Sequence, residues 1–378
     1  MKPRILIALN TAWNLVNFRA GLIRALVAQG YEVVAVAPDD AYSERLAGLG
    51  CRFVALPMDN QGTHPGRDLL LFFRFLKLLH REQPDVFLGY TAKPNIYGSL
   101  AASILGVPVV NNIAGLGAVF IQDGWLVRLV RGLYRVALCR SAKVFFQNND
   151  DRSLFINAGL VKADITDLLP GSGIDLTRFT YTVDEYGLPR SVDNFSFILI
   201  ARMLRDKGVG EYVAAAKLMR VRYPQAQCFL LGFVDAPNPT AISRAEIDDW
   251  VAQGDIIYLG VSDDVRVEIA AADCIVLPSY YREGIPRTLL EAAAMGKPII
   301  TTNAVGCREV VDDGINGYLC KVRDAEDLVA KMLRMIELLP NERAAMGTAG
   351  RKKMELQFDE NIVIDKYLEV IGALVRKG

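Results

Sequence analysis

Two glutamates eight positions apart, Glu283 and Glu291, stand where an expected strand gives way to an expected helix. The apolar run Cys274–Pro278 predicts a buried strand, Tyr280–Pro286 a loop, and Arg287–Met295 a helix. The unpaired amides at the start of such a helix favour a phosphate, and a carboxylate farther along can bind sugar hydroxyls in pairs. The spacing alone fits a ligand site and an ordinary surface loop about equally well.

Two cations, Arg202 and Lys207, follow a second expected strand, Phe197–Ala201. Cations at the mouth of a parallel sheet suit a diphosphate, because guanidinium and ammonium groups pair strongly with phosphate oxygens. Taken alone, the segment Arg202–Gly208 is more typical of a solvated turn. Because both segments lie in the same half of the chain, together they favour a ligand that contains phosphate and sugar.

Strands and helices alternate along the chain, which predicts an α/β fold built on parallel sheets. The alternation starts at Arg4 and restarts at Phe195, and a segment rich in Pro and Gly, Leu168–Asn194, predicts a linker between the two halves. We therefore expect two doubly wound Rossmann-like domains facing a cleft, with ligands at the carboxyl ends of the strands. The other expected elements are the strands Arg4–Leu9, Glu32–Ala37, Gln227–Gly232 and Ile299–Thr301, the loop Asn10–Asn17, and the helices Phe18–Gln29, Gly210–Arg222 and Asp359–Lys377.

The composition excludes several classes of protein. A chain of 378 residues that is 52% hydrophobic can bury two full cores. The balance of 43 basic and 43 acidic residues argues against a nucleic-acid partner. Residues 1–175 carry 18 Lys and Arg against 14 Asp and Glu, so the first half leaves room for a local basic face. The six cysteines form no C-x-x-C pair, which predicts reduced thiols. Without a signal peptide or a run of ~20 apolar residues, we expect a cytoplasmic protein, soluble or peripheral on the inner face of the cell membrane.

The sequence offers few ligands for a metal and no cofactor motif. His64 and His80 are the only histidines, and no Asp-x-Asp triplet occurs, so we expect neither a metal nor a cofactor. The motif G-L-G-A-V-F at Gly115–Phe120 has Phe where a dinucleotide fingerprint has its third glycine, which argues against a dehydrogenase.

The stretch E-G-I-P-R-T-L-L-E, Glu283 to Glu291, resembles the E-x7-E motif of the retaining family 4 glycosyltransferases of the GT-B fold. A-R-M-L-R-D-K-G, from Ala201, resembles the phosphate-binding loop of that family. Four further motifs resemble a narrower branch: K-P-N-I-Y-G at Lys93, G-L-G-A-V-F at Gly115, F-F-Q-N-N-D-D at Phe145 and L-P-G-S-G-I-D at Leu169. That branch contains capsule-polysaccharide transferases and undecaprenyl-diphospho-bacillosamine N-acetylgalactosaminyltransferases.

The resemblance implies roles for these residues. Arg202 and Lys207 would hold the nucleotide diphosphate, Glu291 would bind the ribose, and Glu283 would meet the donor sugar. The expected catalytic residues are Glu283, Arg202 and Lys207. The expected donor-binding residues are Arg202, Lys207, Glu283, Gly284, Ile285, Pro286, Arg287, Thr288 and Glu291, and the segments Gly232–Asp235 and Tyr258–Val265 would shape the base pocket.

On the acceptor side, the chain departs from many members of the family. Asn10-Thr-Ala-Trp-Asn14 stands where they have a Gly-Gly pair, and Thr91 or Ala92 where they have a histidine. A histidine contact to the donor sugar is therefore in doubt. The expected acceptor-binding residues are Asn10, Trp13, Asn17, Arg19, Lys93 and Asn95. The expected domains are residues 1–172 for the acceptor, residues 193–355 for the donor, and a terminal helix, 356–378, that packs back on the first domain.

Two expected helices of the first half carry stripes of cations. Arg67, Arg74, Lys77 and Arg81 share one side of the first helix, and Arg128, Arg131 and Arg135 one side of the second. One such helix is most simply an amphipathic helix packed on a sheet. Two of them favour contact with an anionic membrane surface.

We therefore expect a retaining glycosyltransferase that moves a hexose or N-acetylhexosamine from a UDP-sugar to a polyprenyl-diphosphate-linked saccharide in bacterial glycan assembly. Arg202, Lys207 and the helix that starts at Arg287 would stabilise the departing diphosphate. Three alternatives stay open: a sugar-nucleotide epimerase of the GT-B fold, a glycosyltransferase with a soluble acceptor, and a non-catalytic protein that only binds nucleotide sugar.

Overall fold

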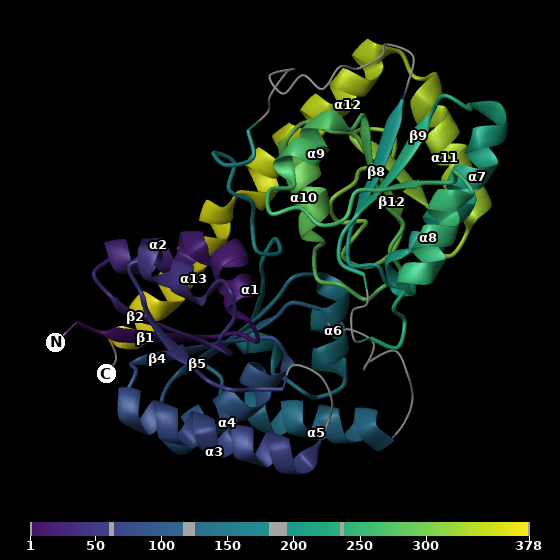
Figure 1. Ribbon diagram of the computed structural model, residues 1–378. Helices are drawn as coiled ribbons and strands as arrows, with labels where there is room; N and C mark the ends of the chain where they lie inside the picture. The colour runs from purple at the N-terminus through teal and green to yellow at the C-terminus, as the bar shows by residue number, and fades with distance from the viewer. Residues whose placement is uncertain (1, 60–63, 116–124, 181–194, 235–237, 377–378) are drawn as a thin grey trace. The chain divides into compact units, whose positions relative to one another are not determined.

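A computed structural model describes residues 2–59, 64–115, 125–180, 195–234 and 238–376 of the chain (Figure 1). Most of the motif Gly115–Phe120, most of the expected linker and Asp235 lie outside these residues. The chain divides into two compact units, residues 1–173 with 360–378, and residues 174–359.

The first unit is built on a seven-stranded parallel sheet with the strand order β3-β2-β1-β4-β5-β6-β7. Its central strands read as continuous apolar runs because helices cover both faces of the sheet. The strands are β1 (Arg4–Ala8), β2 (Glu32–Ala37), β3 (Arg52–Ala55), β4 (Val86–Tyr90), β5 (Val109–Ile113), β6 (Lys143–Phe146) and β7 (Thr166–Leu168).

Helices form a layer on each face of this sheet. On one face, α1 (Ala12–Phe18), α2 (Ala20–Ala28) and the last helix of the chain, α13 (Glu360–Val375), share a core (Figure 1). The other face is covered by α3 (Pro65–Glu82), the π-helical turn η2 (Pro94–Gly98), α4 (Ser99–Ile104), α5 (Trp125–Leu138) and α6 (Asn149–Asn157). Short 3-10 turns, η1 (Ser43–Leu49) and η4 (Ala163–Ile165), complete the unit.

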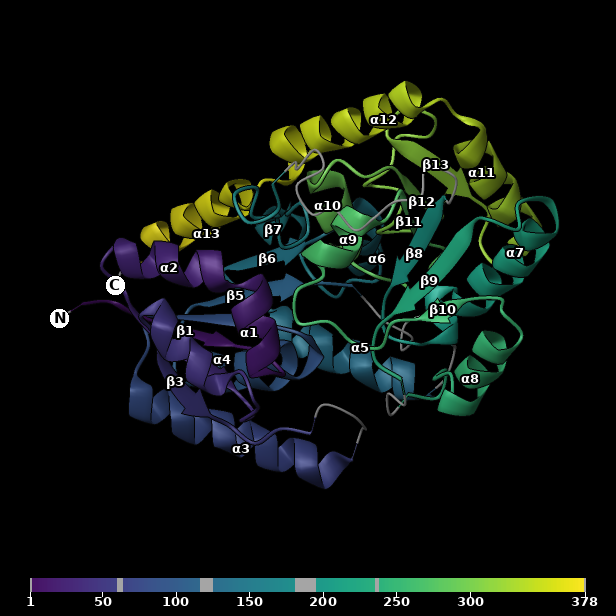
Figure 2. The same cartoon turned by 45° about the horizontal axis from the view of Figure 1, so that its top comes forward.

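The second unit repeats this architecture with a six-stranded parallel sheet of order β10-β9-β8-β11-β12-β13. Its strands are β8 (Ser196–Ile200), β9 (Gln227–Leu231), β10 (Ile257–Tyr258), β11 (Cys274–Leu277), β12 (Ile299–Thr302) and β13 (Gly317–Cys320). Its helices are η5 (Arg205–Lys207), α7 (Val209–Arg222), α8 (Arg244–Ala252), α9 (Arg266–Ala271), α10 (Arg287–Ala294), α11 (Ala325–Glu337), α12 (Pro340–Lys353) and the π-helical turn η6 (Met354–Phe358). Figure 2 shows α9 and α10 on one face of the sheet and α7, α8 and α11 on the other.

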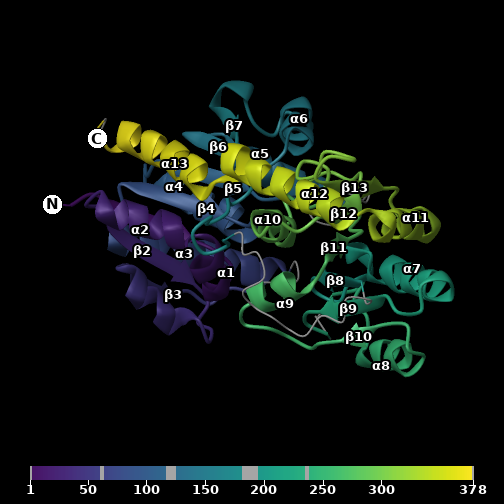
Figure 3. The same cartoon turned by 90° about the horizontal axis from the view of Figure 1, so that it is seen from above.

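The last helix, α13, belongs to the first unit although it ends the chain. It lies along α2 (Figure 3), and Tyr367 and Ile371 are buried in the first core. Asn112 Nδ2 donates to Tyr367 Oη at 3.0 Å, and Lys366 forms an ion pair with Asp167 at 3.0 Å. These contacts fix the end of the chain to the first sheet.

The structure differs from expectation at two places. The second unit starts at Ile174 rather than near residue 193, because Ile174 and Phe179 are buried in its core. The expected loop Asn10–Asn17 is wrong, since most of it is the helix α1. Thr11 caps this helix by accepting from the Asn14 amide at 3.1 Å, and Asp40 accepts from two more of its first amides.

A helix that spans a bilayer needs about 20 predominantly apolar residues. None of the helices in these ranges combines the length and the apolar composition needed to cross a membrane.

Candidate functional site

Two loops meet at the carboxyl edge of the second sheet, one after β8 and one after β11. The carbonyl oxygen of Asp206, in the first loop, accepts hydrogen bonds from the amides of Tyr280 and Tyr281, both at 2.9 Å. Ser279 Oγ also donates to this oxygen at 3.3 Å. Backbone and side-chain bonds therefore hold the two loops in one register.

Lys207 and Glu283 form an ion pair where these loops meet, with Nζ of the lysine on Oε1 of the glutamate. The same carboxylate oxygen accepts a hydrogen bond from Ser279 Oγ at 3.0 Å. The lysine ammonium also lies 5.4 Å from the centre of the Tyr281 ring. Both side chains are mostly buried, with 12% and 14% of their surface exposed, so the pair is oriented and still reachable.

Two glycines allow close approaches here: Gly208 between these two loops, and Gly306 between the loop after β12 and the loop after β11. Gly208 has a φ of +75°, and a Cβ there would lie 2.1 Å from the carbonyl oxygen of Pro278. Gly306 has a φ of +89°, and a Cβ there would lie 1.9 Å from the carbonyl oxygen of Gly284. Any other residue would push the strand-end loops apart, because neither the backbone angle nor the space admits a side chain.

Arg202 lies two positions after the end of β8, is exposed, and makes no side-chain hydrogen bond or ion pair with the described residues. Its neighbours are held close to the next strand, because Met203 N donates to the carbonyl of Phe233 at 2.9 Å. Gly232 (φ +146°) packs on the carbonyl of Ala201. Arg202 is thus a cation at the strand end whose donors are available to a ligand.

Glu291 is paired with Arg287 within helix α10, at 3.1 Å between Nε and Oε1. Burial raises the pKa of the Glu291 carboxyl, and the positive charge of Arg287 opposes that rise. The guanidinium of Arg287 also lies 5.8 Å from the centre of the Phe179 ring. Burial therefore disfavours the charged form of Glu291, and Arg287, one helical turn earlier, stabilises that charge and orients the carboxylate.

The start of α10 is tied to β8 and has no side-chain cap. Thr288 Oγ1 donates to the carbonyl of Ile200 at 3.1 Å, and the cap residue Pro286 has no side chain that could accept from the first amides. With Gly284 and Ile285 before it, this start faces the same strand-end loops as Glu283. Such a helix start suits an anion.

The described part of the two segments expected to shape a base pocket is joined by hydrogen bonds near the end of β8. Tyr258 Oη donates to the carbonyl of Gly232 at 2.7 Å, and the amide of Gly232 donates to the carbonyl of Gly260 at 2.8 Å. Phe233 leaves 57% of its surface exposed next to these bonds. An exposed aromatic ring offers a stacking surface for a planar base.

A buried cysteine packs near the Lys207–Glu283 pair but is a poor nucleophile. Burial, with the charge of Glu283 as a smaller cause, raises the pKa of Cys307 to about 12. The thiol stays neutral near pH 7. Within the described ranges, no group of three or more His, Cys, Asp or Glu side chains is arranged to hold a metal ion.

The carboxyl edge of the first sheet carries the expected acceptor residues on α1. Trp13 is 38% exposed and packs edge-on against Phe18, with ring centres 5.0 Å apart. Asn10 Oδ1 accepts from Asn14, and Asn17 Nδ2 donates to the carbonyl of Trp13 at 2.9 Å. The short helix thus presents an open indole ring at the strand ends.

Lys93 and Asn95 follow β4, and their surroundings differ. Lys93 Nζ pairs with Asp68 at 2.7 Å, and Tyr97 Oη donates to the other oxygen of Asp68 at 3.0 Å. Asn95 is buried; it donates to the carbonyl of Asn112 and accepts from Asn111. The side chain of Asn95 is consequently occupied inside the unit, and the geometry does not favour it as an acceptor ligand.

Sequence reasoning missed Ser279 and Asp68. Ser279 lies between the expected strand and the loop that starts at Tyr280, where a hydroxyl has no distinctive pattern. Asp68 stands 25 positions before Lys93, in the first turn of another helix. Two backbone features distinguish the segment around Lys93. Thr91 has a φ of +59°, which is unusual for a β-branched residue, and a π-helical turn follows it.

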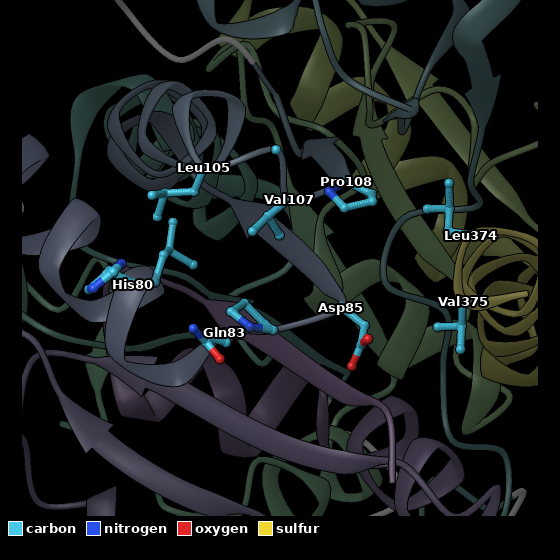
Figure 4. Close-up of a pocket in the computed structure, with 11 residues that line it drawn as sticks. His80, Gln83, Asp85, Leu105, Val107, Pro108, Leu374 and Val375 are labelled. Atoms are coloured by element: carbon cyan, nitrogen blue, oxygen red, sulfur yellow. The ribbon is translucent and has the colours of Figure 1, made fainter. Parts of the chain in front are cut away.

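A cavity of about 540 Å³ lies at the opposite edge of the first sheet (Figure 4). Asp85 and Pro108, which line it, precede β4 and β5, so it opens at the amino ends of the strands. The rest of its wall is formed mainly by aliphatic side chains from α3 and α13 and by the segment 105–107. It shares no residue with the candidate site.

Comparisons with known proteins assign both halves of the chain to described families. Residues 17–171 match the family described as glycosyl transferase 4-like domain, and residues 194–338 match glycosyl transferases group 1. The chain is 29% identical over 376 residues to an N,N'-diacetylbacillosaminyl-diphospho-undecaprenol α-1,3-N-acetylgalactosaminyltransferase of Campylobacter jejuni, with 96% of each chain covered. It is 23% identical over 279 residues to a UDP-Gal:α-D-GlcNAc-diphosphoundecaprenol α-1,3-galactosyltransferase of Escherichia coli, covering 72% of this chain and 71% of that one.

Solved structures share the fold over the whole chain. A glycosyltransferase of Rickettsia africae superposes with a TM-score of 0.81 at 18% identity, with 100% of both chains covered. Two Rossmann-like units, each on a parallel sheet, form the GT-B architecture of such enzymes. The expected fold class is confirmed.

Proposed function

The chain belongs to the group 1 glycosyltransferases with a family 4-like first domain, and we propose that it transfers a hexose or N-acetylhexosamine from a UDP-sugar to a polyprenyl-diphosphate-linked saccharide. The observation that carries the proposal is the likeness over 96% of both chains to a transferase whose named acceptor is an undecaprenol diphosphate-linked sugar. A second relative is named for both a UDP-linked donor and such an acceptor. The reaction would be one step in the assembly of a bacterial glycan.

The donor binds at the carboxyl edge of the second sheet in this proposal. Arg202 and Lys207 pair with the diphosphate, the uncapped start of α10 adds its amides, and Glu291 accepts from the ribose hydroxyls. As the sugar leaves, negative charge grows on the phosphate oxygens. Fixed cations and amides stabilise that charge more in the transition state than in the ground state.

Glu283 contacts the donor sugar rather than attacking it. Its Oε1 already accepts from Lys207 and Ser279, which fixes the carboxylate as an acceptor for sugar hydroxyls. With the Cys307 thiol neutral, a leaving phosphate oxygen is the base that takes the acceptor proton, on the face from which the phosphate departs. The acceptor oxygen bonds to the anomeric carbon as the phosphate bond breaks, so the configuration is retained.

The acceptor binds at the carboxyl edge of the first sheet, next to α1. Trp13 offers an exposed ring face to a sugar, and Asn10 and Asn17 supply amide groups beside it. Lys93, neutralised by Asp68, is positioned to donate to a sugar hydroxyl or a phosphate oxygen.

A membrane surface is the further partner in this proposal, reached peripherally from the cytoplasmic side. Helix α3 exposes Leu69, Leu70 and Phe73 by 58%, 49% and 54%, and Lys77 and Arg81 follow on the same helix. Arg74 contributes less than its sequence position suggests, because it donates to the carbonyl of Pro57 at 2.6 Å, and Arg81 contributes less because it forms an ion pair with Glu82 at 2.8 Å. Cations attract anionic headgroups, and the apolar side chains insert shallowly.

The decisive test is the release of UDP from a panel of UDP-sugars, with and without a lipid-linked saccharide acceptor. We expect release that depends on the lipid acceptor. Conversion of the UDP-sugar to its epimer without release would indicate an epimerase, which neither relative's name favours. Release with a free oligosaccharide alone would indicate a soluble acceptor, and binding without turnover a non-catalytic protein.

A further inference from the structure

Arg19 is a buried cation without a counter-ion at the acceptor edge of the first sheet. Only 6% of the residue is exposed, and its side chain makes no ion pair or hydrogen bond with any residue in the described ranges. Charged groups buried to this degree are normally paired, because the loss of hydration is costly. An arginine in this state indicates a partner that arrives with a ligand.

The backbone fixes Arg19 at the strand ends. The residue ends α1 and caps the start of α2, where it accepts through its own carbonyl from the amide of Ile23 at 2.9 Å. Its guanidinium lies over the ring of Tyr90, the last residue of β4, with 4.4 Å between the guanidinium carbon and the ring centre. The ring holds the cation in place without neutralising it.

No carboxylate of the described residues forms an ion pair with Arg19. Burial raises the pKa of Tyr90 well above its usual range, and burial also raises the pKa of Tyr367, so both phenols are neutral near pH 7. Glu360 packs against Gly21 at the start of α2 and forms no ion pair with Arg19. The charge of the guanidinium is left for an anion from outside.

The two Nη nitrogens of Arg19 are the atoms left to bind a ligand. Nε is buried without a hydrogen-bond partner, and neither Nη forms a hydrogen bond with the described residues. The terminal nitrogens of a guanidinium form a planar fork that matches two oxygens of one phosphate. The ligand group that this geometry favours is therefore a phosphate rather than a neutral sugar hydroxyl.

We propose that Arg19 binds a phosphate of the acceptor's diphosphate and thereby distinguishes diphosphate-linked saccharides from free ones. The inference rests on the proposed function, because it is that function which supplies a diphosphate on the acceptor. The donor diphosphate has its own cations, Arg202 and Lys207, in the other unit. In this proposal Arg202 binds the diphosphate of the donor and Arg19 binds that of the acceptor.

The test compares two acceptors that carry the same saccharide, one on a polyprenyl diphosphate and one on a simple alkyl chain. Arg19→Gln should raise the KM for the diphosphate acceptor by about 10- to 100-fold, the range for losing a hydrogen-bonded charge, and leave the KM for the alkyl glycoside unchanged. Arg19→Lys should restore part of the loss. Arg24→Gln, which removes an exposed cation from the same helix, should change neither.

Equal loss on both acceptors would reduce Arg19 to a structural role, and no loss on either would remove it from binding. A second readout does not need turnover: with UDP present in saturating amounts, inorganic pyrophosphate should raise the unfolding temperature of the wild type but not of Arg19→Gln. An equal rise in both proteins would overturn the inference. A wild type that pyrophosphate stabilises but that transfers to neither acceptor would refute the proposed function and leave the anion site standing.

Discussion

Lys207 and Glu283, 76 positions apart in the chain, form an ion pair at the carboxyl edge of the second sheet. The loops that carry them are joined by hydrogen bonds to the carbonyl of Asp206 and kept close by Gly208. A donor sugar that reaches Glu283 therefore also meets the cation that we propose to pair with the diphosphate. Several predictions rest on this proximity.

Removing either cation that faces the diphosphate should lower turnover by about 10²-fold or more, the scale for losing one preorganised donor to a developing charge. The variants are Arg202→Ala and Lys207→Ala. Arg205→Ala is the matched control, since it lies in the same loop, pairs with Glu246 at 2.5 Å and is assigned no ligand contact. Initial rates at saturating donor and acceptor check this, and near-normal turnover in both variants would remove the two residues from the mechanism.

Glu283→Gln should mainly lower turnover, because the charged carboxylate positions both the donor sugar and Lys207. The UDP affinity of the variant should stay close to that of the wild type. Calorimetric titration with UDP, beside steady-state rates, separates the two effects. A variant with weak UDP binding and normal turnover at saturation would contradict the assignment.

Glu291→Gln should mainly weaken the binding of UDP rather than lower turnover. Contacts to the ribose are much the same before and during reaction, so we expect weaker binding of UDP with a smaller effect on turnover. The same titration is the measurement. Unchanged UDP affinity would mean that the ribose is bound elsewhere.

The stability of the same variant should depend on pH. Burial raises the pKa of Glu291 above its ordinary value of 4.5, so the folded chain holds this proton more tightly than the unfolded chain does. The contribution of Glu291 to stability then falls as the pH rises from about 4.5 through the raised pKa. Glu291→Gln removes this effect, and its unfolding temperature relative to wild type should increase between pH 4.5 and pH 7. A difference that stays constant over this range would refute the argument.

Binding to anionic vesicles should fall when the exposed cations of α3 are reversed. Reversing Lys77 removes about 1 kcal/mol, or about 5-fold in affinity, at ~1 kcal/mol for each cation near the surface, and Arg81 adds less because it forms an ion pair with Glu82 at 2.8 Å. The variant is Lys77→Glu with Arg81→Glu. Arg24→Glu with Lys162→Glu makes the same change of charge at exposed positions outside α3 and α5. Cosedimentation at rising salt is the measurement, and equal binding of wild type to neutral and anionic vesicles would exclude an electrostatic role.

The sequence predicted the parallel sheets and most strand ends because buried strands of such sheets are continuous apolar runs. The strand Glu32–Ala37 matches the structure at both ends. The helix α1 was missed because its start is stabilised by Asp40, far along the chain, and because its Asn residues favour turns in isolation. The expected linker ends sooner than its Pro and Gly content suggests, because Ile174 and Phe179 are already core residues.

The candidate site likewise has residues that the sequence predicts and contacts that only the fold reveals. Arg202, Lys207, Glu283 and Glu291 lie in local motifs that can be read along the chain. The pairing of Lys207 with Glu283, the bond from Ser279 and the neutralisation of Lys93 by Asp68 depend on the fold. The isolation of Arg19 is also invisible in the sequence, because it depends on the burial of neutral groups around the side chain.

The most direct test of the central claim is the structure of the product. Wild-type protein would be incubated with the preferred UDP-sugar and a polyprenyl-diphosphate-linked saccharide, and the lipid extract analysed by mass spectrometry and NMR. The account predicts a lipid that has gained one sugar residue, joined with the anomeric configuration of the donor. An unmodified lipid across the panel of UDP-sugars, or a product with inverted configuration, would contradict it.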